Sequence, residues 1–248
     1  METKLNAPKG FNSYEEYRNY DNRACEVVNN FLDRNCYNFF TSKTLKRITA
    51  TSEQIKGVDC KFQANKLTKS DYEYICDEKA AVKWANKDLQ TFSIELQFVN
   101  RAGHLHNGWF LAENQINNCY NFIYTDKIKD ENGNYNYKTF TESDIKEVTC
   151  IFVRKERIKE YLKSIGWTQE LLEDKCKEIR RTNGKCDLCD IEKDGLRFCF
   201  SSYLPERPIN ILLSRRKLIE LSDIVYKYND TYVEFWHNKK KWYAFTEK

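Results

Sequence analysis

Glycine, histidine and long apolar runs are scarce in this sequence, and each scarcity excludes a class of protein. Only 8 of the 248 residues are glycine, and neither a P-loop nor a G-x-G-x-x-G pattern occurs. We therefore do not expect an enzyme that binds ATP or NAD. The signatures of serine hydrolases are missing as well. The 3 histidines are His104, His106 and His237, and one pair with a remote third residue does not predict a histidine-based metal centre.

The apolar runs are short. No run approaches the ~20 residues that a membrane helix requires, and the polar segment from Met1 to Tyr20 lacks the apolar centre of a secretory signal. We therefore expect a cytoplasmic protein without a membrane partner. Thiols stay reduced in that compartment, so we expect the 10 cysteines to be free.

One cysteine pattern has a second interpretation. Cys186-x-x-Cys189 is half of a zinc site, and Cys176 and Cys199 are available to complete a structural Zn²⁺ site with four thiolates. The intervals of 10 residues on either side of the pair are not those of a standard zinc knuckle, and Cys176 falls inside a predicted helix. We favour free cysteines over structural zinc.

Apolar, aromatic and charged residues are abundant instead. Hydrophobic residues make up 41% and aromatic residues 15% of the chain, which predicts a folded protein rather than a disordered one. The 41 Lys and Arg residues exceed the 37 Asp and Glu residues only slightly, giving a formal charge of +4. That excess is too small to indicate a particular partner.

The apolar spacing predicts an α/β (α+β) fold with a central mixed β-sheet flanked by helices. A first helix should begin at Ser13, where Glu16 has the spacing of a capping box, and end near Arg34. We predict residues 1–137 as a core and 138–248 as an α+β C-terminal region, or one continuous domain. Further strands are expected at 58–62, 72–75, 91–98, 107–111, 119–125, 147–153, 197–201, 209–213, 232–236 and 242–245, and further helices at 154–164, 168–181 and 215–221.

The decisive motif is Asp59, followed after 17 residues by Asp77-Glu78-Lys79. Side chains alternate along a strand, so Asp77 and Lys79 point to one face and Glu78 to the other. If that strand pairs with the strand that bears Asp59, two carboxylates and one amine converge. Two carboxylates bind a hard divalent cation such as Mg²⁺, and the amine can orient an attacking water or offset charge that develops at phosphorus. The alternative is a surface salt-bridge ladder on a hairpin.

These residues resemble the motif of the PD-(D/E)XK nuclease superfamily, with Asp59 as its first acid, Asp77 as its second and Lys79 as its lysine. Val58 stands where many members have proline. The resemblance covers residues 13–125 and implies a restriction-endonuclease-like core, a Mg²⁺ cofactor that Mn²⁺ can replace, and a metal-binding acid on the preceding helix. Glu26 is the favoured candidate for that acid, and Glu16 is the alternative.

Three nearby residues can extend this site. Glu95 and Gln97 fall on one face of the next predicted strand, where a third metal ligand and a contact to water or phosphate are expected if that strand neighbours the Asp77 strand. Lys83 follows Lys79 by four residues and is a candidate phosphate contact. The alternative for all three is an ordinary solvent-facing position.

Two basic clusters in the C-terminal half are candidate nucleic-acid contacts. Arg215 and Arg216 form one, and Lys239, Lys240 and Lys241 form the other among aromatic residues, an arrangement that suits phosphate binding and base stacking. A solvated surface or a lysine-protected sheet edge is the alternative.

We therefore expect a Mg²⁺-dependent endonuclease that acts on DNA, with restriction or phage defence as its setting by analogy. Cleavage of two strands requires two active sites, so a homodimer is expected. The alternatives are a nucleic-acid-binding protein without catalysis, and a nuclease that acts on RNA or is activated by a nucleotide signal.

Overall fold

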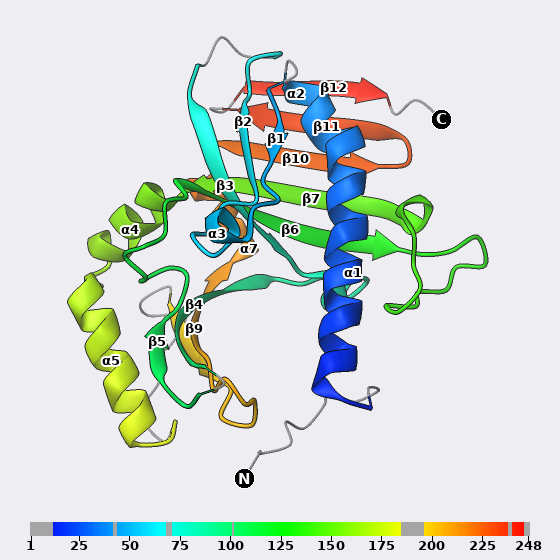
Figure 1. Cartoon of the computed structure of the whole chain (residues 1–248). Helices are drawn as coiled ribbons and strands as arrows, with labels where there is room; N and C mark the ends of the chain where they lie inside the picture. Colours follow the sequence, from blue (N-terminus) through cyan, green and yellow to red (C-terminus); the bar gives the residue numbers. More distant parts are fainter. Residues whose placement is uncertain are drawn as a thin grey trace.

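Two β-sheets and the helices that cover them make up the part of the chain described by this computed structural model, residues 12–41, 44–67, 71–100, 102–184, 196–237 and 240–245 (Figure 1). Within these residues the larger sheet has eight strands in the order β1 (Lys46–Arg47), β2 (Cys60–Gln63), β3 (Glu73–Ala80), β6 (Cys119–Ile128), β7 (Ile145–Arg154), β10 (Ile224–Asn229), β11 (Tyr232–His237) and β12 (Lys240–Phe245). The smaller sheet has four strands in the order β5 (Leu105–Asn107), β4 (Thr91–Val99), β9 (Ile209–Ser214) and β8 (Arg197–Phe200).

The first helix begins where the sequence predicts. Helix α1 (Tyr14–Leu32) is capped by Ser13, whose hydroxyl accepts a hydrogen bond from the Glu16 backbone N–H at 3.0 Å. It continues as a π-helical turn, η1 (Asp33–Tyr37), and α2 (Asn38–Phe40), so the helical segment passes the predicted end. The other helices are α3 (Thr51–Gln54), η2 (Val82–Trp84), η3 (Glu142–Asp144), α4 (Lys155–Ser164), α5 (Gln169–Arg181) and α7 (Arg215–Leu221).

Helix α1 lies across one face of the larger sheet (Figure 1). Its buried residues Ala24, Val28 and Leu32 belong to one apolar cluster with Cys76 of β3 and Tyr226 of β10. This spacing of four residues belongs to the apolar stripe of an amphipathic helix. Burial of that stripe holds α1 against the sheet.

The opposite face of the larger sheet packs against the smaller sheet and two helices. Tyr120 of β6 and Ile151 of β7 share a buried cluster with Ile94 of β4, Leu162 of α4 and Ile179 of α5. The larger sheet is therefore the middle of three layers. Successive residues of its strands point alternately towards α1 and towards the smaller sheet.

Strand β3 has two different neighbours. It pairs antiparallel with β2, with Cys76 opposite Cys60, as the hairpin prediction requires. On its other side it pairs parallel with β6, with Asp77 beside Tyr120. The pairings given above for the other strands are antiparallel, so the larger sheet is mixed.

The predicted α/β fold with a large mixed sheet flanked by helices is confirmed. Pairing of β6 with β7 carries the larger sheet across residue 137, so that position does not separate two sheets. Strand β10 was not predicted, and β5 ends at Asn107, short of the predicted 107–111. Among the described residues no helix is both long and apolar enough to span a membrane.

Candidate functional site

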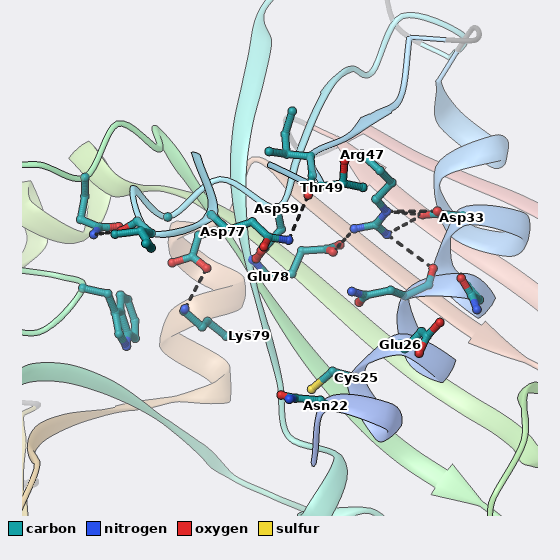
Figure 2. Close-up of a pocket in the computed structure, with 18 of the residues that line it drawn as sticks. Asn22, Cys25, Glu26, Asp33, Arg47, Thr49, Asp59, Asp77, Glu78 and Lys79 are labelled. Carbon is teal, nitrogen blue, oxygen red and sulfur yellow. Dashed lines mark hydrogen bonds and ion pairs between the residues drawn. The ribbon is translucent and has the colours of Figure 1, made fainter. Parts of the chain in front are cut away.

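A cavity of about 790 Å³ opens between α1 and the β1–β3 region (Figure 2). Its lining includes all three residues of the predicted motif: Asp59, Asp77 and Lys79. The other lining residues used below are Arg18, Cys25, Glu26, Asp33, Arg47, Gln54, Gly57, Glu78, Trp109 and Gln115.

The two acids of the motif meet because β2 and β3 pair at this point. The Asp59 backbone N–H donates to the Cys76 carbonyl at 2.9 Å, and Asp59 Oδ2 accepts a hydrogen bond from the Glu78 backbone N–H at 2.7 Å. Asp77 follows Cys76 and is 3% exposed. The two carboxyl groups are neighbours in the wall of the cavity.

This proximity changes the acidity of Asp59. Burial raises the pKa of Asp59, the neighbouring Asp77 charge raises it further, and the net result is a pKa of about 6 despite the hydrogen bond from Glu78. Two carboxylates that share a buried position repel each other unless a proton or a cation lies between them. A cation bound between the two carboxylates would therefore relieve their repulsion.

Lys79 completes the cluster. Its Nζ lies 2.8 Å from Asp77 Oδ1 and 5.0 Å from the centroid of the Trp109 ring. Burial lowers the pKa of Lys79, but the carboxylates of Asp77, Asp59 and Glu95 more than offset this, so that the pKa lies above its usual value. Lys79 is therefore a cation at neutral pH.

Glu78 points to the opposite face, as alternation requires (Figure 2). It forms an ion pair with Arg47, and it accepts a hydrogen bond from the Tyr37 hydroxyl at 2.5 Å. Arg47 Nε also donates to Asp33 Oδ1 at 2.9 Å. This partly buried network ties β3 to β1 and to the end of the first helical segment, and it lies beneath α1 rather than beside Asp77.

Comparison with family models, with curated proteins and with solved structures finds no match for this chain. What the site can do is therefore inferred from its own residues.

The next strand does not neighbour the Asp77 strand, which was the condition for a role of Glu95 and Gln97 in the site. Strand β4, which carries Glu95 and Gln97, belongs to the smaller sheet, and a register shift occurs between these two residues. Glu95 nevertheless lies near Lys79. Its pKa lies above the usual value, because burial outweighs the Lys79 charge and a hydrogen bond from the Trp109 backbone, which both lower it. Gln97 Oε1 accepts from Arg180 Nε at 3.3 Å, so this amide faces α5.

The remaining predicted site residues near the first helix do not join the acid pair. Glu26 lines the cavity, but in Figure 2 it lies on the Glu78 side of β3, whereas Asp77 and Lys79 point away from α1. Lys83 is exposed, and its amine lies 4.9 Å from the centroid of the Tyr17 ring.

Some of the predicted nucleic-acid contacts form ion pairs within the protein, and others are exposed. Arg215 binds Asp126 through two hydrogen bonds of 2.6 and 2.7 Å, so it stabilises the fold, whereas Arg216 is exposed. Lys240 is exposed and Lys241 pairs with Glu234 at 3.2 Å. Both lie on β12, at the opposite edge of the larger sheet from β1, and Lys239 is outside the described residues.

Two of the four cysteines in the zinc hypothesis, Cys186 and Cys189, lie outside the described residues. Cys176 is buried on the inner face of α5, and Cys199 lies on β8. Burial raises the pKa of the Cys176 thiol to about 12.

Two residues near the acid pair were not predicted from the sequence. Lys155 begins α4, and burial with the nearby Lys159 lowers its pKa to about 8, although the charge of Asp77 acts in the opposite direction. Gln115 lies in the cavity wall. Neither follows the motif at a recognisable spacing, because the β3–β6 pairing brings the loop with Gln115 to the site and the β6–β7 pairing brings Lys155.

The donor set suits a hydrated divalent cation held by two carboxylates. Asp77 Oδ2 is buried and has no hydrogen-bond partner among the described residues, and Asp59 faces the same space. Within those residues no group of three or more His, Cys, Asp or Glu side chains is placed to hold a metal ion. Mg²⁺ is commonly held in this way, by one or two carboxylates with water and substrate phosphate completing its shell.

Proposed function

We propose that this protein is a Mg²⁺-dependent nuclease that hydrolyses phosphodiester bonds, with DNA as its substrate. The observation that carries the proposal is the convergence of Asp59, Asp77 and Lys79 on one cavity. The similarity of these residues to the PD-(D/E)XK motif supports it, as does the mixed sheet on which they lie. A restriction-endonuclease-like core is part of the proposal.

The charge of the cavity supports the need for a cation. Its lining carries five acidic side chains, Glu26, Asp33, Asp59, Asp77 and Glu78, against three basic ones, Arg18, Arg47 and Lys79. A phosphodiester is an anion and would be repelled by this surplus of negative charge. A divalent cation on the acid pair would reverse the local sign and let the phosphate approach.

Each residue of the motif has a distinct role in this mechanism. Asp59 and Asp77 would hold the Mg²⁺, which when bound supplies Lewis acidity and lowers the pKa of a water. The Glu78 backbone N–H fixes the direction of the Asp59 carboxylate. Lys79, a cation held between Asp77 and the Trp109 ring, places positive charge where negative charge develops on the phosphate oxygens.

The test is cleavage of plasmid DNA, single-stranded DNA and RNA with Mg²⁺ and with EDTA. We expect cleavage of DNA that requires Mg²⁺ or Mn²⁺, and a loss of at least about 100-fold in Asp77→Asn and Lys79→Met. Asp71→Asn and Lys129→Met are matched controls, since both residues are exposed, and they should cleave like the wild type.

Three outcomes would contradict the proposal in different ways. Binding of nucleic acid without cleavage in Mg²⁺ or Mn²⁺ would indicate a binding protein. Cleavage confined to RNA would correct the substrate. Activity that survives both site variants would remove the assigned active site. The proposed homodimer is tested separately by the molar mass in solution.

A further inference from the structure

Two buried amide oxygens next to the acid pair have no hydrogen-bond partner. Gln115 Oε1 and Asn117 Oδ1 share this property with Asp77 Oδ2 in the described part of the chain. A buried polar atom without a partner costs about 1–3 kcal/mol. Native proteins leave few such atoms, and a water or an ion often explains them. Asp77 and Gln115 both line the cavity, so these unpartnered oxygens need a common explanation.

The direction of both amides is fixed by their nitrogen atoms. Gln115 Nε2 donates to the Ile55 carbonyl at 3.1 Å, and Asn117 Nδ2 donates to the Cys119 carbonyl at 3.3 Å. Reversing either amide would place its oxygen against a carbonyl oxygen. The two unpartnered atoms are therefore acceptors, and a positively charged group is a suitable neighbour for them.

Gly57 shows that the two oxygens share one location. A Cβ on Gly57 would lie 2.1 Å from Gln115 Oε1 and 3.2 Å from Asn117 Oδ1. Gly57 precedes Asp59 by two residues and, with Gln115, lines the same cavity. Its φ of +72° and its missing side chain let the loop before β6 come close to the loop before β2.

Asn117 is also linked to the second acid. Asn117 is 4% exposed, and its amide hydrogen-bonds to Tyr120. Tyr120 lies beside Asp77 in the parallel pairing of β3 and β6. The loop that precedes β6 thus brings amide oxygens to the side of the acid pair that faces away from α1.

We propose that Gln115 Oε1 and Asn117 Oδ1 are ligands of the cation site, which combines two carboxylates with two neutral oxygens. This inference rests on the proposed function, because it concerns the same Mg²⁺. Asn and Gln carbonyl oxygens are hard ligands of the kind that bind divalent cations in proteins. The two amide oxygens would take the place of the metal-binding acid on α1 that the resemblance implies, since Glu26 does not join the acid pair.

The test is Mn²⁺ binding to the metal-free, full-length protein without nucleic acid, with free Mn²⁺ measured by electron paramagnetic resonance. Gln115→Leu and Asn117→Ala should each weaken Mn²⁺ binding about 10-fold or more. Gln54→Leu is the matched control: Gln54 lines the same cavity and its Nε2 donates to the Ile48 carbonyl at 3.0 Å, but its oxygen is not among the buried unpartnered atoms. It should bind Mn²⁺ like the wild type.

The outcomes separate this inference from the proposed function. If Asp77→Asn abolishes Mn²⁺ binding while Gln115→Leu and Asn117→Ala bind normally, the amides are not ligands and the carboxylate site stands. If the wild type binds no Mn²⁺, both proposals fail. Melting in EDTA identifies a variant that does not fold, and Gln115→Leu, at a partly exposed position, then decides the result.

Discussion

Replacing Asp59 with asparagine should stabilise the metal-free protein at neutral pH and leave it unimproved in acid. The change removes a carboxylate that is less favourable in the folded state than in the unfolded state, while the asparagine carbonyl can still accept the hydrogen bond from Glu78. The expected gain follows from the pKa of Asp59, which rises from its ordinary value of 3.8 to about 6 on folding. That difference corresponds to about 3 kcal/mol, since a tenfold change in acidity is worth about 1.4 kcal/mol.

The dependence on pH has a definite sign. Because the folded-state pKa is raised, the contribution of Asp59 to stability is fully present below about pH 4 and is lost as the pH rises through about 6. An asparagine at this position does not titrate and has no such loss. Partial exposure of Asp59 screens the effect, so we expect Asp59→Asn to gain about 2 kcal/mol relative to the wild type between about pH 4 and pH 7.

Urea unfolding in EDTA, followed by tryptophan fluorescence at both pH values, measures this difference. Asp71→Asn controls for loss of an exposed carboxylate and should show no pH-dependent gain. A difference between Asp59→Asn and wild type that is equal at the two pH values would refute the electrostatic reasoning. Mg²⁺ at pH 7 should then raise the stability of the wild type but not of Asp59→Asn, because binding stabilises only a protein that has the site.

Three further predictions concern the surroundings of the site. Arg47→Met should lower the free energy of unfolding by about 3–5 kcal/mol because it leaves the Glu78 carboxylate buried without a cation; the double variant with Glu78→Gln should recover much of this in urea unfolding, and a single-variant loss under about 0.5 kcal/mol would contradict it. Gly57→Ala should cost about 1–2 kcal/mol for its positive φ alone, and thermal melting would contradict this if it were unchanged. Arg215→Met should lower stability by about 1–3 kcal/mol, whereas Arg216→Met should leave the melting temperature unchanged; equal effects of the two variants would contradict the assignment of Arg215 to the fold.

The acid pair was predictable because its geometry is local. Strands β2 and β3 are joined by a short connection, and Cys60, Phe62, Tyr74 and Cys76 provide the alternation that fixes their faces. Once these strands pair, Asp77 must point with Lys79 and away from Glu78. Sequence alone therefore sufficed for the part of the site that a hairpin builds.

The rest of the site depends on partners that are distant in the chain. Alternation in residues 91–98 predicts a strand but not its neighbour, and β4 pairs with β9, more than 100 residues later. Strand β10 begins with the contiguous buried run Ile224, Val225 and Tyr226, which has no alternation because both of its faces are covered. Asp126, the partner of Arg215, is 89 residues away.

The positions of the paired cysteines imply an asymmetry in which insertions this protein can tolerate. The connection between Gln63 and Glu73 starts with Ala64 and Leu67, which pack on the core, but a change of its length after Leu67 leaves Cys60 opposite Cys76 and costs little. One residue added between Cys76 and Asp77 would instead turn the aspartate and the lysine towards α1 and send Glu78 to the opposite side. A change of length in the connection before β3 would therefore leave the acid pair in register, whereas a change directly after Cys76 would abolish the site.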